Sequence, residues 1–176
     1  MSRPTKVIKA PPAPWQQGLP PVLAARTRLV VLGSFPGVAS LQAQQYYAHP
    51  RNQFWPILGS IWDLDLVAMP YAQRLQVLLD RGLGLWDVYA RCRRPGSLDQ
   101  AIEEAEPNDL RQLLQLAPGL QAVAHNGGES ARARCQTAAL GLAVHRLPST
   151  SPANASWSFD RKRQAWAQVL TVCAGV

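Results

Sequence analysis

The sequence predicts an α/β fold in three layers, with a four-stranded parallel sheet lying between two layers of helices. Short segments rich in Val, Leu and Ala alternate with longer segments whose apolar residues recur at helical spacing. Strands that are apolar on both faces and separated by helices are typical of parallel sheets covered on both sides. The length of 176 residues suits one domain built around one core.

The N-terminal segment is rich in proline. Residues 1–20 contain five prolines and show no hydrophobic periodicity, so we expect an extended arm there. Trp15 is the residue that would hold this arm against the rest of the protein. Residues 21–176 are expected to form a single domain.

The elements of that domain follow from the spacing of apolar residues and from turn signals. Four strands are expected, at residues 27–32, 83–88, 121–124 and 143–147. Helices are expected at residues 52–62, 71–79, 97–104 and 108–116, after the 125–128 turn as far as residue 140, and at 159–172. A short helical turn at residues 40–45 would begin with Ser40 as its cap.

The composition points to a polyanionic partner. The formal net charge is +7 and the isoelectric point is about 9.9. A surplus of positive charge favours binding to nucleic acid, because each neutralised phosphate releases counterions. The alternative is a basic composition typical of GC-rich bacterial proteomes, which the excess of Arg over Lys also fits.

The cysteines and the hydropathy of the chain limit which cellular compartment and which kinds of site we expect. The three cysteines form no CxxC pair, which argues against a disulfide framework, an iron–sulfur cluster or another metal site. The apolar runs are too short to span a membrane, and no hydrophobic signal core opens the chain. We therefore expect a cytoplasmic protein of bacterial type, with neither a metal nor a membrane partner.

Polar clusters follow each predicted strand. They lie at residues 33–35, at Asp87, at His125 and Asn126, and at residues 148–154. The carboxyl ends of parallel strands share one edge of the sheet, where the ligand crevice of such folds lies. These clusters are therefore expected to border one site.

Each cluster also has a purely structural interpretation. The glycines and proline of residues 33–37 match neither a P-loop nor a GxGxxG motif, so they form either a pocket or a tight connection. Asn52 serves either chemistry or as a helix cap, and the aromatic residues at 46, 47, 54 and 55 either stack on a base or pack in the core. Asp87 alternatively caps a helix or pairs with an arginine at 91, 93 or 94. The residues at 125–126 and 149–154 alternatively form turns.

Taken together, six segments resemble the uracil-DNA glycosylase superfamily, and most closely its hypoxanthine-DNA (deoxyinosine) glycosylase branch. They are GSFPG at 33–37, YYAHPRNQFW at 46–55, LWDV at 85–88, GSLD at 96–99, HNG at 125–127 and LPSTSPAN at 147–154. The segments occur in the family's order between residues 28 and 158. The resemblance implies a four-stranded parallel sheet of the uracil-DNA glycosylase type.

The resemblance implies an enzyme that flips a deaminated base out of DNA and hydrolyses its N-glycosidic bond. The expected substrate is hypoxanthine in deoxyinosine, with uracil and xanthine as further candidates. No cofactor is implied. The expected partner is damaged DNA. The protein is expected to be a monomer that associates with the nucleoid when it acts on DNA. No Lys lies in the six segments to form a Schiff base, so a monofunctional enzyme that leaves an abasic site is expected.

Departures from the superfamily pattern define the expected catalytic residue. Phe35 stands where many relatives carry the Asp or Asn that positions the attacking water, so this role is expected to pass to Asn52. Asp87 stands where relatives carry a base-reading Asn, and a carboxylate would accept a hydrogen bond from hypoxanthine N1–H. Leu147 replaces a His that assists departure of the base in the most active uracil enzymes.

The resemblance also implies two larger groups of residues around Asn52. The base pocket is expected to comprise Gly33, Ser34, Phe35, Pro36, Gly37, Phe54, Asp87, His125 and Asn126, with either Phe35 or Phe54 stacked on the base. DNA contacts are expected from Tyr47, His49, Arg51, Ser149, Thr150, Ser151, Pro152 and Asn154. The basic residues near this loop, Arg161, Lys162 and Arg163, are either further phosphate contacts or the solvated first turn of the last helix. The alternative function is a non-catalytic DNA- or lesion-binding protein on the same fold.

Overall fold

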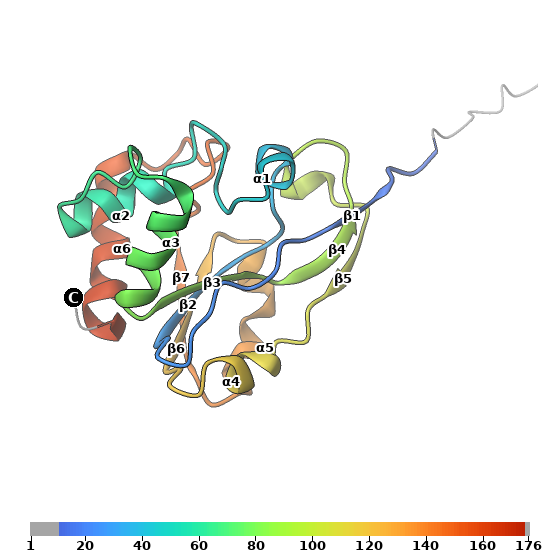
Figure 1. The fold of residues 1–176 in the computed structure, drawn as a ribbon. Helices are drawn as coiled ribbons and strands as arrows, with labels where there is room; N and C mark the ends of the chain where they lie inside the picture. Colours follow the sequence, from blue (N-terminus) through green and yellow to red (C-terminus); the bar gives the residue numbers. More distant parts are fainter. Residues whose placement is uncertain (1–10, 175–176) are drawn as a thin grey trace, which may run out of the picture.

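The three-layer α/β/α architecture is confirmed in a computed structural model, which describes residues 11–174 (Figure 1). All four strands of the central sheet run parallel, in the order β3-β2-β6-β7. They are β2 (Leu29–Gly33), β3 (Leu83–Asp87), β6 (Ala122–Asn126) and β7 (Ala143–Leu147). The predicted strands coincide with these to within a few residues at each end.

Helices cover both faces of this sheet. One face carries α2 (Phe54–Trp62), α3 (Tyr71–Asp80) and α6 (Phe159–Ala174). The other carries α4 (Gln112–Leu116), the 3₁₀ helix η2 (Ser130–Ala133) and α5 (Arg134–Ala138). No helix within residues 11–174 has both the length and the apolar character needed to cross a membrane.

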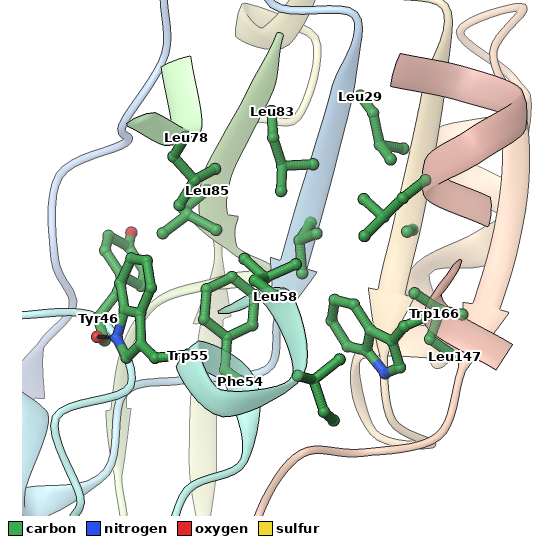
Figure 2. Packing of buried hydrophobic residues seen from close by; sticks show 14 of the residues in the cluster. Leu29, Tyr46, Phe54, Trp55, Leu58, Leu78, Leu83, Leu85, Leu147 and Trp166 are labelled. Carbon is green, nitrogen blue, oxygen red and sulfur yellow. Dashed lines mark hydrogen bonds between the residues drawn. The ribbon is translucent and has the colours of Figure 1, made fainter. Parts of the chain in front are cut away.

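The side chains of β2 point alternately to the two faces of the sheet, and they contribute to two separate core clusters. Leu29 and Val31 are fully buried against the α2, α3 and α6 layer, whereas Val30 and Leu32 are buried on the opposite face. Side chains alternate between faces along a strand, so a fully apolar strand supplies both cores. In Figure 2, Phe54 lies between Trp55 and Trp166 in the larger cluster, and the ring of Trp166 is edge-on to Phe54 at 5.7 Å.

A second, antiparallel sheet departs from the sequence prediction. It pairs β1 (Trp15–Gln17) with β4 (Tyr89–Arg93), and β4 with β5 (Glu104–Pro107). The arm expected over residues 1–20 therefore gives way to a strand at residue 15, and the buried Leu19 belongs to the core. Residues 1–10 of the expected arm lie outside the described residues.

Contacts with β4 explain the strand at residues 15–17. The guanidinium groups of Arg91 and Arg93 lie 4.7 and 5.0 Å from the centre of the Trp15 ring. Gly18 N–H donates to the carbonyl of Ala90 at 2.8 Å. Cation–π contacts and a backbone ladder thus hold a segment that has no periodicity of its own.

The prediction of a helix at residues 97–104 is wrong. Only the 3₁₀ turn η1 (Asp99–Ala101) forms there, and Glu104 begins β5. Glu104 and Glu106 face Arg93 and Arg91 across the β4–β5 ladder, so opposite charges favour strand pairing over a helix.

Two helix starts also differ from expectation. The turn predicted at residues 40–45 is α1 (Val38–Ala43), and it begins after Gly37. Ser40 is not its cap, because the Ser40 hydroxyl lies within the helix and accepts a hydrogen bond from the N–H of Ala48 at 3.1 Å. The helix expected at residues 108–116 is limited to α4, since residues 108–111 form its approach.

Replacing Trp166 tests the link between the core and the loop after β7. Trp166 is fully buried, and its indole Nε1–H donates to the carbonyl of Pro148 at 3.1 Å. We expect Trp166→Ala to lower the free energy of unfolding by about 3–5 kcal/mol in urea titrations, because it leaves a large cavity. Trp166→Phe should be less destabilising, since it refills most of the space. Equal destabilisation in both variants would mean that the indole hydrogen bond, and not packing, dominates.

Candidate active site

The carboxyl ends of the four parallel strands border one groove of about 1230 Å³. Its walls come from segments that are far apart in the sequence but adjacent at this edge of the sheet. They are residues 33–37, 46–52, Asp87, 97–100, 126–129 and 146–154, with Trp157 at the end of the last wall.

Most of the residues expected from the sequence line this groove. They are Gly33, Ser34, Phe35, Pro36, Gly37, Tyr47, His49, Arg51, Asn52, Asp87, Asn126, Ser149, Thr150, Ser151, Pro152 and Asn154. Phe54, His125, Arg161 and Arg163 are not among its lining residues. The structure thus brings Asn52 and Asp87, which are 35 positions apart in the sequence, to the walls of the same groove.

Phe54 belongs to the core and not to the base pocket. It is fully buried and stacks on Tyr47 with ring centres 4.0 Å apart. Phe35 lines the groove, and the guanidinium of Arg94 lies over its ring, 5.2 Å from the ring centre. Of the two candidate stacking residues, only Phe35 is therefore in reach of a ligand.

His125 is a structural residue, which corrects its assignment to the base pocket. It is fully buried, with Nδ1 2.9 Å from the hydroxyl of Ser130 and Nε2 3.0 Å from that of Thr137. The Ser130 hydroxyl also bonds the carbonyl of Leu32, and the Thr137 hydroxyl that of Arg134. Burial lowers the pKa of His125 to about 4. The neutral ring holds η2 and α5 against β6.

Asp87 is a buried carboxylate at the carboxyl end of β3. It faces Gly33 in the parallel register, and a Cβ at position 33 would clash with Asp87 Oδ1. Asp87 is 4% exposed, and within the described residues its Oδ2 has no hydrogen-bond partner. Burial raises the pKa of Asp87 to about 7, helped by the charge of Asp99 and opposed by that of Arg94.

The alternative interpretation of Asp87 as an ion-pair partner is wrong. Arg91 pairs with Glu106 at 2.6 Å, and Arg93 lies 3.9 Å from Glu104. The fully buried Arg94 lies 3.7 Å from Asp99 and donates to the carbonyl of Pro36. The three candidate arginines are thus taken by other partners, and Asp87 faces the groove.

Tyr47 carries backbone strain at the groove wall. Its φ of 56° lies in the left-handed region, which a bulky residue rarely adopts. Its hydroxyl is buried without a hydrogen-bond partner in the described part of the chain, and burial, with the nearby Asp87 charge, raises the pKa of its phenol. Two unpartnered polar groups, on Tyr47 and Asp87, therefore lie at one end of the groove.

Asn52 lies in the turn before α2. Its Oδ1 accepts a hydrogen bond from the N–H of Phe54 at 3.0 Å, so the side chain does help to begin the helix. Its backbone N–H donates to the carbonyl of His49 at 2.8 Å. These two bonds leave the Nδ2 amide group available at the groove wall.

The next residue ties this turn to two other elements. Gln53 N–H donates to the carbonyl of Thr150 at 3.0 Å, and its Oε1 accepts from Lys162 Nζ at 2.8 Å. Lys162 is 2% exposed, and burial lowers its pKa. Lys162 is therefore not a surface phosphate contact. It is a buried cation that fixes Gln53 and, through Gln53, the position of Asn52.

The loop at residues 148–154 is held by Asn126. The Asn126 amide donates from Nδ2 to the hydroxyl of Thr150, and its Oδ1 accepts from the N–H of Thr150, both at 3.0 Å. Gly127 adopts a φ of 99°, and a Cβ there would lie 2.9 Å from that of Ser149. Asn126 lines the groove, but its amide is used to position the loop.

Several residues around the groove were not assigned a role from the sequence. Asp99 accepts from the hydroxyl of Ser34 at 2.7 Å, and the hydroxyl of Ser97 accepts from Val38 N–H at 2.9 Å. Glu129 accepts from the hydroxyl of Tyr89 at 2.7 Å. The GSLD segment at 96–99 drew attention to Ser97 and Asp99 in the sequence. Its spacing, however, does not show that this segment packs against residues 33–38.

A pair of exposed side chains stands at the rim. The Trp157 ring lines the groove and is 37% exposed, and the guanidinium of Arg161 lies 4.4 Å from its centre. Arg161 therefore reaches the groove only through Trp157. No group of three or more His, Cys, Asp or Glu residues within residues 11–174 is arranged to hold a metal ion.

Known proteins are similar to this chain in sequence and in fold. The family model for the uracil DNA glycosylase superfamily matches residues 20–170. A hypoxanthine DNA glycosylase from Methanosarcina barkeri is 39% identical over 88% of this chain and 98% of its own length. A protein of the same name from Methanosarcina acetivorans is 34% identical over the same shares.

A solved structure shows the same architecture. It is the solution NMR structure of a protein from Methanosarcina acetivorans that is assigned provisionally as a uracil DNA glycosylase. Its TM-score is 0.81 at 34% identity, and the match covers 89% of this chain and 96% of that protein.

The raised pKa of Asp87 predicts how stability depends on pH. The folded state holds the Asp87 proton up to about pH 7, whereas the unfolded chain releases it near pH 3.8. The free energy of unfolding should therefore fall between about pH 4 and pH 7, by roughly 1–4 kcal/mol. Asp87→Asn should remove most of this decrease in urea titrations at pH 5 and pH 8. Asp63→Asn, on an exposed turn, is the control, and equal pH dependence in wild type and Asp87→Asn would contradict the prediction.

Proposed function

Because the chain belongs to the uracil DNA glycosylase superfamily and is a DNA glycosylase, we propose that it removes hypoxanthine from deoxyinosine in DNA. Uracil and xanthine are further candidate substrates. The observation that carries this proposal is the buried, unpartnered carboxylate of Asp87 in the same groove as Asn52. The names of the two Methanosarcina relatives support the same substrate.

Recognition of the flipped base is assigned to Asp87 and Phe35. Hypoxanthine carries a donor at N1, and the almost fully buried Asp87 offers acceptor oxygens at the groove. Above about pH 7, where Asp87 is ionised, this hydrogen bond is charge-assisted, and in such surroundings it is stronger than in water. Phe35 supplies an apolar face for stacking at the groove wall. Extrusion of the nucleotide is needed because the glycosidic bond is not accessible within the base stack.

Asn52 is the proposed catalytic residue. In hydrolysis, the C1′–N9 bond of deoxyinosine breaks, and its electron pair leaves with the base. A water oxygen then bonds to C1′, and one water proton ends on hypoxanthine while the sugar becomes an abasic site. The Asn52 amide can orient water through its Nδ2 donors, and its Oδ1 keeps one lone pair beside the hydrogen bond from Phe54 N–H with which to stabilise positive charge on the sugar. An amide is, however, a poor base. The reaction is therefore driven by departure of the base.

The absence of an amine nucleophile supports monofunctional chemistry. No lysine lines the groove in the described part of the chain, and Lys162 is bonded to Gln53. The enzyme should therefore stop at the abasic site without cutting the strand. We place this activity in the cytoplasm on the nucleoid DNA, carried out by a monomer. Its single glycosylase domain comprises the expected residues 21–176 together with β1 and Leu19. Arg51 and the loop at residues 149–154 supply DNA contacts along the groove.

The central test is base release from defined duplexes. Purified protein without added metal or nucleotide should release hypoxanthine from a duplex with one inosine, and alkali should then cut the strand. We expect Asn52→Ala to slow release by roughly 100-fold or more, because it removes a group that stabilises the transition state. Gln76→Ala, an amide on α3 outside the groove, is the matched control. Tight binding with no abasic product would favour the alternative, a lesion-binding protein.

Base selection is tested separately at Asp87. Asp87→Asn exchanges one acceptor oxygen for a donor and removes the charge. We expect the ratio of hypoxanthine release to uracil release to fall in this variant under single-turnover conditions. A variant that keeps the wild-type ratio would exclude Asp87 as the residue that reads the base.

A further inference from the structure

A second hollow adjoins the groove on the side of β7. It is lined by Gly128, Ala131, Arg132, Arg134, Cys135 and Arg146. Gly128 and Arg146 also line the main groove, so the two concavities are adjacent. Three of its six lining residues are arginines, and none of the six is acidic.

Two of the three arginines in this hollow have no ion pair within residues 11–174. Several arginines away from the groove edge are matched by carboxylates, as in Arg26–Asp80, Arg91–Glu106 and Arg111–Asp109. Arg134 and Arg146 have no ion pair or side-chain hydrogen bond within residues 11–174, and both are exposed. Arg132 makes only a 3.5 Å contact with Glu129, and its side chain is 76% exposed. Two unneutralised charges are therefore concentrated here.

The backbone elements that carry these arginines are held in place by hydrogen bonds to the central sheet. Arg132 lies in η2 and Arg134 begins α5, and the bonds from His125 to Ser130 and Thr137 hold both elements against β6. Arg146 lies near the end of the edge strand β7, with its Nη2 3.4 Å from the place of a Cβ on Gly128. Arg146 lines both the hollow and the groove.

We propose that this hollow binds backbone phosphates of the DNA duplex next to the flipped nucleotide, through Arg134 and Arg146. The proposal rests on the proposed function, in that it takes DNA as the polymer in the groove. A guanidinium offers planar, paired donors that fit phosphate oxygens, and an unpaired one gains most from neutralising them. A bound phosphate here would extend the DNA footprint from the groove across the edge of the sheet. Arg132, already shared with Glu129, contributes less.

The test measures binding to undamaged duplex, which does not depend on base release. Fluorescence anisotropy over a range of NaCl concentrations gives the slope of log K against log salt. We expect the double variant R134A/R146A to reduce this slope by about 0.9 for each phosphate that is no longer neutralised, or about 1.8 for two phosphates. The charge-preserving variant R134K/R146K should retain most of the slope. Arg26→Ala, an exposed arginine before β2 and paired with Asp80, is the control.

The outcomes separate this inference from the proposed function. A slope in R134A/R146A equal to that of wild type, or lowered no more than in Arg26→Ala, would overturn the phosphate site. Thermal unfolding of R134A/R146A near the wild-type temperature would establish that the effect is local, as expected for exposed side chains. A reduced slope together with no release of hypoxanthine by the wild-type protein would refute the proposed reaction while supporting the phosphate site.

Discussion

The contact on which the groove depends is the approach of the Asp87 carboxylate to the backbone of Gly33. Parallel pairing of β2 and β3 sets these residues opposite one another at the edge of the sheet. Because any side chain at position 33 would occupy the place of Asp87 Oδ1, glycine is required there. The same contact removes water from the carboxylate, which raises its pKa and leaves an acceptor that only a ligand or a water molecule can satisfy.

Most other polar groups around the groove hold its walls in place. Asn126 is bonded to Thr150, Lys162 to Gln53, and Asp99 to the hydroxyl of Ser34. Arg94 fixes the carbonyl of Pro36 and packs against Phe35. These bonds position loops that have little regular structure of their own, which suits a site that must be rigid before the base arrives. The side chains left for chemistry are correspondingly few.

Local patterns in the sequence were sufficient for the central sheet. Uninterrupted apolar runs such as residues 29–32 predict strands that helices cover on both faces. The carboxyl ends of these parallel strands share one edge of the sheet, and this edge brings Asn52, Asp87 and residues 149–154 together. The small sheet was not predictable in this way. Trp15 pairs with Arg93 across 78 positions, and Glu104 follows a segment whose composition suits a helix. Pairing between distant segments overrides local propensity there.

The sequence by itself determined the class of fold, the family and the order of the groove segments, because strand–helix alternation and short motifs are local properties. Only the tertiary structure decided which residues face the groove. His125 and Phe54 stand beside groove residues in the chain but point into the core, whereas Asp99 and Arg146 are brought to the groove wall from other elements. The physical reason is that successive side chains on a strand point to opposite faces and those on a helix point around its axis, so burial and exposure depend on the layer packed against each face.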